Sequence, residues 1–175
     1  PIVPSYERLD RDFQISDGVV LPLGAEHTFT RYRLQANTAD RRILATQSRV
    51  EFGNFFSGNR REVVVNLSVR PRPGVLVNLQ SEWNHVDLPE GRFNTRVYRV
   101  VADTQFSPWT YLVNNVQFDS VSANVGWQSR LRWTLRPGND VYLVYTQNWH
   151  DDAVQDRFVT LERRGAAKFV YTYRY

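Results

Sequence analysis

Alternation of apolar and polar residues with a period of two constrains this chain most. In residues 124–136, one side reads Val125, Trp127, Ser129, Leu131, Trp133 and Leu135, and the other reads Asn124, Gly126, Gln128, Arg130, Arg132, Thr134 and Arg136. A helix would scatter the tryptophans and arginines around its whole surface, whereas a β-strand separates them onto two faces. The segment is therefore expected to be a strand with one apolar and one polar face.

The same pattern recurs along most of the chain. Nine candidate strands follow, at 27–36, 44–52, 62–70, 75–83, 93–104, 108–118, 124–136, 140–149 and 168–175, and no segment shows a convincing helical period. This strand content far exceeds the roughly 20–25% of an ordinary globular chain. The 175 residues are thus predicted to form one all-β domain, with 1–26 as an irregular external segment and the strands in 27–175.

The predicted connections between these strands alternate in length. Residues 71–74, 105–107 and 137–139 carry Pro or Gly and predict tight turns, and 37–42 is slightly longer; residues 53–60, 86–92, 119–123 and 150–167 predict longer polar loops. Outer-membrane β-barrels have short periplasmic turns and longer external loops. This pattern favours an antiparallel up-and-down transmembrane barrel of about 8–10 strands.

Alternation alone does not say which face meets which medium. A soluble barrel or sandwich that binds a ligand would bury the Trp127 and Trp133 face and expose Arg130 and Arg132, whereas a membrane barrel turns its apolar face to lipid. The candidate strands have the length that spans a bilayer, about 9–11 residues. Tryptophan prefers the headgroup level, so an aromatic girdle is predicted. Its members would be Trp83, Trp109, Trp127, Trp133 and Trp149.

The C-terminus resembles the signal by which bacterial outer-membrane proteins are recognised for insertion. Phe169, Tyr171, Tyr173 and Tyr175 occupy every second position and end the chain on an aromatic residue. The expected partners are therefore the lipid bilayer and the outer-membrane assembly machinery of a Gram-negative bacterium. With Tyr175 in the periplasm, the turns at 71–74, 105–107 and 137–139 fall on the periplasmic side.

Composition adds an expectation about completeness. The chain contains no Met and no Cys, residues 1–20 lack the plan of a signal peptide, and nine strands are an odd number. The odd count means either that residues 1–26 hide one more strand or that upstream strands are missing. The absence of Met and of a signal peptide favours the second alternative, the C-terminal portion of a longer barrel. The absence of cysteine excludes disulfides and thiolate metal sites.

Several stretches carry a family resemblance: 6–9 (YERL), 29–33 (FTRYR), 50–58 (VEFGNFFSG), 130–133 (RLRW) and 136–145 (RPGNDVYLVY). They resemble the C-terminal barrel of the bacterial family known as domain of unknown function 5916. The resemblance implies a structural anchor or channel for a periplasmic domain that is like a carbohydrate-binding module. That domain is not in this sequence, so no carbohydrate-binding residue is transferred from it.

The polar faces of the candidate strands gather basic residues. Those expected to face the lumen are Arg31, Arg33, Arg49, Arg70, Arg130 and Arg132, with Glu51, Glu62, Glu82 and Lys168 on the same side. Arginines clustered in a pore would favour an anionic solute, and the family association suggests a saccharide. The competing interpretation is that the arginines pair with acids on neighbouring strands and only brace the wall.

No catalytic constellation is present. His27, His85 and His150 map to the external ends of strands, and the sequence 150–152 (HDD) is a weak metal motif, so no metal or cofactor is predicted. Arginines and aromatics fall on opposite faces, which disfavours nucleic acid, because a stacking platform needs both on one surface. The chain is expected to be non-enzymatic.

Overall fold

The computed structural model describes residues 2–152 and 156–173, and it contains strands only. The strands are β1 (Ile2–Arg8), β2 (Phe13–Ser16), β3 (Val19–Leu21), β4 (Glu26–Asn37), β5 (Leu44–Phe55), β6 (Gly58–Arg72), β7 (Val75–Leu88), β8 (Gly91–Ser107), β9 (Thr110–Asp119), β10 (Asn124–Arg136), β11 (Asn139–Asp152) and β12 (Arg157–Val170). The all-β prediction is confirmed. None of the described residues belongs to a helix that is long and apolar enough to cross a membrane.

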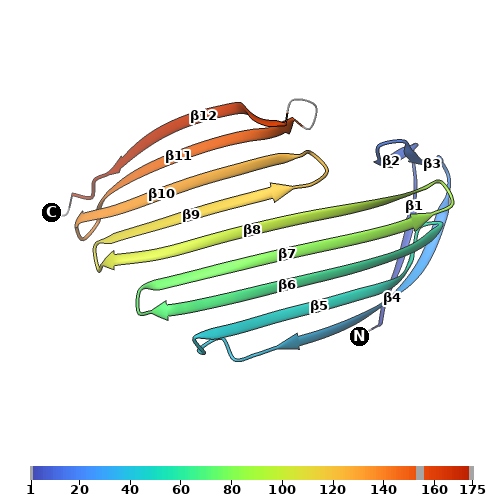
Figure 1. Cartoon of the computed structure of the whole chain (residues 1–175), viewed down its shortest axis with the longest axis horizontal. Helices are drawn as coiled ribbons and strands as arrows, with labels where there is room; N and C mark the ends of the chain where they lie inside the picture. Colours follow the sequence, from blue (N-terminus) through green and yellow to red (C-terminus); the bar gives the residue numbers. More distant parts are fainter. Residues whose placement is uncertain (1, 153–155, 174–175) are drawn as a thin grey trace.

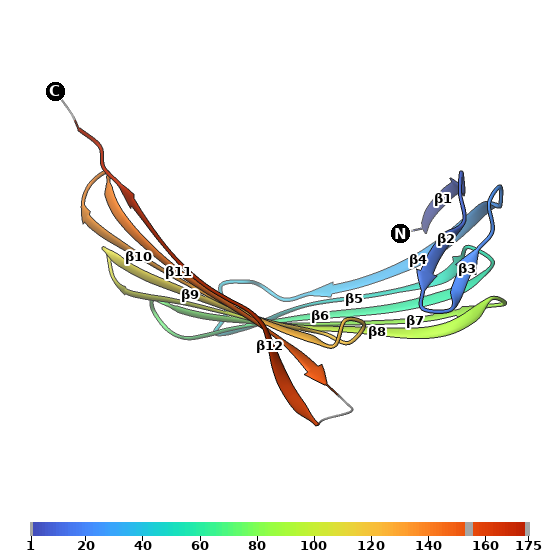
Figure 2. The same cartoon turned by 90° about the horizontal axis from the view of Figure 1, so that it is seen from above.

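Ten of these strands form one antiparallel sheet in the order β1-β4-β5-β6-β7-β8-β9-β10-β11-β12. Each strand from β4 onward pairs with the next one in the chain, as Figure 1 shows. The sheet is bowed and twisted (Figure 2), but within the described residues β1 and β12 remain two separate edges. The up-and-down antiparallel part of the prediction is therefore confirmed, whereas closure into a barrel is not observed.

The N-terminal segment differs from expectation. Residues 1–26 were predicted to be irregular, with one hidden strand as the alternative, and β1, β2 and β3 lie there. β1 pairs with β4 over seven positions, from Ile2 opposite Tyr32 to Arg8 opposite Glu26, and this strand makes the sheet even-numbered. These strands are too short to show a long alternation of apolar and polar residues. Backbone pairing with a neighbouring strand defines them, and the sequence pattern does not reveal this pairing.

The predicted difference between short turns and long loops is wrong. The turns at 73–74, 108–109 and 137–138 are tight as expected, but 56–57 and 89–90 are equally short. Residues read as loop extend the hairpins instead, because Gly53 pairs with Arg60 and Phe55 with Gly58. The longest connection between consecutive strands of β4–β12 is 38–43, on the side where short turns were expected.

The last strand was also misplaced. Residues 150–167 were expected to be a loop before a strand at 168–175, but β11 continues to Asp152 and β12 spans Arg157–Val170. Its central residues Gly165, Ala166 and Ala167 carry no apolar alternation, so pairing with β11 defines the strand. Tyr171 and Tyr173 follow the strand, and Tyr175 lies outside the described residues.

The β2–β3 hairpin packs on the concave side of the sheet, at the end where β7 meets β8 (Figure 2). Its Leu21 is fully buried, and Val19 is 5% exposed. They pack in one apolar cluster with Val86 and Leu88 of β7, and Phe93 of β8 lies against it. The tips of β7 and β8 present apolar side chains on an otherwise polar side, and the hairpin removes these side chains from solvent.

Candidate functional site

The sheet has two faces of opposite character, because residues directly opposite one another in antiparallel strands point to the same side. One register row aligns Leu34, Val50, Val63 and Trp83, and we call this side the apolar face. The neighbouring row aligns Arg33, Glu51, Glu62 and Asn84, and we call that side the polar face. These faces match the assignment predicted from the sequence.

Across β4 to β7, the apolar face is the more exposed of the two, whereas on β10 Arg130 and Arg132 of the polar face are exposed and Leu131 of the apolar face is half-buried. Leu34 is 64% exposed, Leu79 is 39% and Leu143 is 47%, whereas Glu51 and Glu62 on the polar face are only 4% and 6% exposed. A soluble chain shows the reverse arrangement, since carboxylates rarely lie deeper than leucines. Within the described residues, nothing covers the apolar face.

Aromatic residues mark two levels of the apolar face. Trp83 and Trp149 lie toward the end where β7 and β11 finish, and the Nε1 of Trp83 donates a hydrogen bond to the hydroxyl of Tyr98 at 3.1 Å. Trp133 lies at the opposite end and is 52% exposed, and Trp109, in the turn 108–109 at that end, is 50% exposed. These four residues take positions compatible with two girdles.

The fifth tryptophan departs from that arrangement. Trp127 lies between the two levels and is half-buried, with its ring edge-on to Tyr145 at 5.2 Å. Its Nε1 donates to Asn114 at 3.4 Å, and the Tyr145 hydroxyl donates to Gln147 at 2.6 Å. A small polar inclusion thus interrupts the apolar face, and its polar groups bond to one another. Arg163 of β12 lies opposite Gln147 at the border of this inclusion.

On the polar face, acids and arginines form a ladder across β4, β5 and β6. Glu51 binds Arg31 at 3.0 Å and Arg33 at 2.7 Å, and Glu62 binds Arg49 at 3.0 Å and Arg60 at 2.7 Å. Arg60 also donates from Nε to Asn84 of β7 at 2.9 Å. Buried carboxylates are stable here because each is held by two guanidinium groups.

The other predicted basic residues divide into two kinds. Arg132 binds Asp140 through Nε and Nη2 at 3.2 and 3.1 Å, next to the turn at 137–138. Arg70 and Arg130 make no ion pair within the described residues. Four of the six predicted arginines therefore have an acid partner, although Arg31 and Arg33 share Glu51, and this pairing favours the bracing interpretation over an anion filter.

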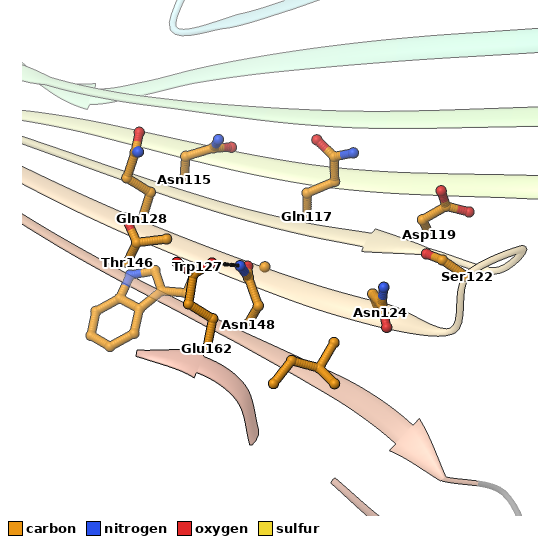
Figure 3. Close-up of a pocket in the computed structure, with 12 residues that line it drawn as sticks. Asn115, Gln117, Asp119, Ser122, Asn124, Trp127, Gln128, Thr146, Asn148 and Glu162 are labelled. Carbon is orange, nitrogen blue, oxygen red and sulfur yellow. Dashed lines mark hydrogen bonds between the residues drawn. The ribbon is translucent and has the colours of Figure 1, made fainter. Parts of the chain in front are cut away.

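The other half of the polar face is rich in amides and contains a hollow of about 810 Å³ over β9 to β12 (Figure 3). Five amide side chains contribute to its lining: Asn115, Gln117, Asn124, Gln128 and Asn148. Gly126 lies among them, in the middle of β10, and the missing side chain deepens the hollow. No Lys or Arg lines it.

Sequence reasoning missed this hollow, because asparagine and glutamine were treated as neutral spacers between the apolar positions. The available signal was the recurrence of amides at every second residue, as in Asn115 and Gln117 or Asn124 and Gln128. Only the strand register shows that these residues gather on one side.

Two of the three histidines pair with amide side chains. His85 bonds to Asn94 at 2.6 Å and His150 to Asn124 at 3.0 Å, so each ring pairs with an amide. Within 2–152 and 156–173, no three residues of the His, Cys, Asp or Glu types come together closely enough to hold a metal ion.

The C-terminal aromatics are exposed wherever the structure describes them. Phe169 is 61% exposed at the end of β12, and Tyr171 and Tyr173 are 63% and 67% exposed beyond it. Phe169 pairs with Val141 on the apolar face, and Val141 in turn pairs with Trp133, so Phe169 lies at the level of Trp133. The role of these aromatics as an assembly signal stays a prediction.

No protein-family model matches the sequence, and no curated protein matches it. The resemblance to domain of unknown function 5916 therefore stays a prediction.

Proposed function

We propose that this chain is the membrane-spanning wall of a bacterial outer-membrane β-barrel, which serves as an anchor or channel for a periplasmic domain and is not an enzyme. The observation that carries the proposal is the inverted burial of the two faces across β4 to β7. Leu34 and Trp133 are more than half exposed, while Glu51 and Glu62 are buried. Lipid would cover the first kind of surface, and a wet lumen suits the second.

Strand length and aromatic placement support the same function. Strands β4 to β12 run for 10 to 17 residues, whereas about 9–11 tilted residues suffice to span a bilayer. Trp83 and Trp149 would mark one interface, and Trp109 and Trp133 the other. An open sheet with two free edges would close by pairing its own edges or by pairing with additional strands.

The competing function is a soluble ligand-binding barrel or sandwich, which would need a partner layer to cover the apolar face. The two functions differ in what the tryptophans touch. Folded protein in vesicles made from phospholipids with brominated acyl chains should lose most of its tryptophan fluorescence, because bromine quenches on contact. The same protein in unbrominated vesicles is the control.

Heating supplies the second half of this test. Closed membrane barrels resist dodecyl sulfate until boiled, so unheated protein should migrate differently from boiled protein on a denaturing gel. Unquenched fluorescence, together with identical migration and free solubility in plain buffer, would contradict the membrane function and favour the soluble one.

A further inference from the structure

The hollow over β9 to β12 lies apart from the arginine ladder, and its chemistry is different. The ladder on β4 to β7 is fully charged, and its acids are saturated by arginine. The hollow presents amides, which donate through nitrogen and accept through oxygen without carrying charge. Figure 3 shows Asn115, Gln117 and Gln128 projecting from neighbouring strands on the same side of the sheet.

The two carboxylates that line the hollow are already engaged. Asp119 accepts a hydrogen bond from the Val121 amide at 2.8 Å and so closes the turn after β9. Glu162 accepts from Asn148 at 3.2 Å and pairs with Arg164 at 2.8 Å. Lys and Arg are absent from the lining of the hollow, and Glu162 already has a cationic partner, so amides supply most of its free hydrogen-bonding groups.

The amides of the hollow differ in whether they already have a hydrogen-bond partner. Asn115 accepts from Arg99 at 3.0 Å, and Asn124 bonds to His150 at 3.0 Å. The side chains of Gln117 and Gln128, by contrast, make no hydrogen bond to any residue in the described part of the chain. Each therefore retains two donors and one acceptor oxygen that point into the hollow.

Gly126 gives a second, independent indication of a binding site. A glycine in the middle of a strand weakens the strand and often marks a place where another molecule approaches the backbone. A Cβ on this residue would lie 3.0 Å from the Oδ1 of Asn148, so a side chain would both crowd that amide and fill the floor of the hollow.

From this geometry we infer that the hollow binds an uncharged, polyhydroxylated solute of the saccharide class, held mainly by Gln117 and Gln128 above Gly126. Hydroxyl groups both donate and accept, as amides do, and a neutral sugar needs no charged partner. The inference rests on the proposed function, because the polar face becomes a lumen only if the sheet closes.

The test uses the full chain folded in detergent micelles, with maltotriose as the neutral probe. Saturation-transfer NMR should show magnetisation passing from the protein to the sugar protons. Gln128→Leu should weaken binding by roughly three- to tenfold, the size of one or two lost hydrogen bonds. Gly126→Val should abolish binding by filling the floor.

Gln35→Leu is the matched control, since Gln35 is an exposed amide on β4, on the same face but outside the hollow. It should bind the sugar as the unaltered chain does. Absence of transfer to maltotriose, or equal loss of binding in Gln35→Leu and Gln128→Leu, would overturn the assignment. Each sample is also run unheated and boiled on a gel, so that loss of sugar binding with an intact heat shift refutes the saccharide site alone.

Discussion

Replacing Glu51 with glutamine tests whether the ion-pair ladder braces the wall. The side chain of Glu51 is 5% exposed and contacts two guanidinium groups, at 3.0 Å from Arg31 and 2.7 Å from Arg33. Glutamine has nearly the same shape but no charge, so the substitution leaves both arginines without their counter-ion while it changes the packing little.

The size of the effect follows from burial. Removing one partner of a fully buried pair costs about 3–5 kcal/mol. The side chains of Arg31 and Arg33 are 19% and 34% exposed, so water can solvate part of the freed charge. We therefore expect Glu51→Gln to lower the free energy of unfolding by about 2 kcal/mol.

The assay is urea unfolding of the chain in phospholipid vesicles, followed by tryptophan fluorescence and extrapolated to zero denaturant. Glu26→Gln is the matched control, because Glu26 is 56% exposed and lies 3.8 Å from Arg8, a geometry worth at most about 0.5 kcal/mol. If the two variants lose the same free energy to within about 0.5 kcal/mol, the ladder does not brace the wall.

Two further substitutions test local features of the sheet. Gly53→Ala should destabilise the chain by about 2 kcal/mol or more in the same assay, because Gly53 has a φ of +147° and a Cβ there would lie 2.3 Å from the carbonyl oxygen of Thr30. Gly165→Ala, where a Cβ meets nothing within 4 Å, should be tolerated, and equal losses would refute the steric argument. Leu21→Ala should cost about 2–4 kcal/mol and increase hydrogen exchange in β2 and β3 first, because Leu21 is fully buried between the hairpin and the sheet. Exchange that rises uniformly through all strands would show that the hairpin and the sheet unfold as one unit.

The sequence predicted those strands in which one residue type alternates strongly. In β10, Trp133 and Arg132 were placed on opposite faces, and the register with β9 and β11 keeps them there. β12 was missed over its central residues because Gly165, Ala166 and Ala167 have side chains too small to show a face. The hairpin tips were missed for another reason: Gly53 and Arg60 are polar or small, yet backbone pairing continues past them.

The candidate site was less predictable than the fold, because pairing partners set its chemistry. The arginines of β4 and β5 could be assigned to the polar face from alternation alone. Whether they face a solute or an acid depends on register, which places Glu51 opposite both Arg33 and Glu62. The hollow depends on register in the same way, since its amides come from three strands.

The polar face carries a buried ion-pair ladder over β4 to β6 and an amide-lined hollow over β9 to β12, and their separation has a physical consequence. In the ladder, each buried carboxylate already has two arginine partners, so a solute there would have to break ion pairs that stabilise the wall. In the hollow, Gln117 and Gln128 keep unused hydrogen-bonding capacity, so a solute can bind without removing any support of the sheet. Stability and recognition are thus carried by different strands, β4 to β7 and β9 to β12.

It follows that Glu51→Gln should destabilise the sheet more than it weakens sugar binding, and Gln128→Leu should do the opposite. If both substitutions changed the free energy of unfolding and the affinity for sugar in the same proportion, the ladder and the hollow would not be independent.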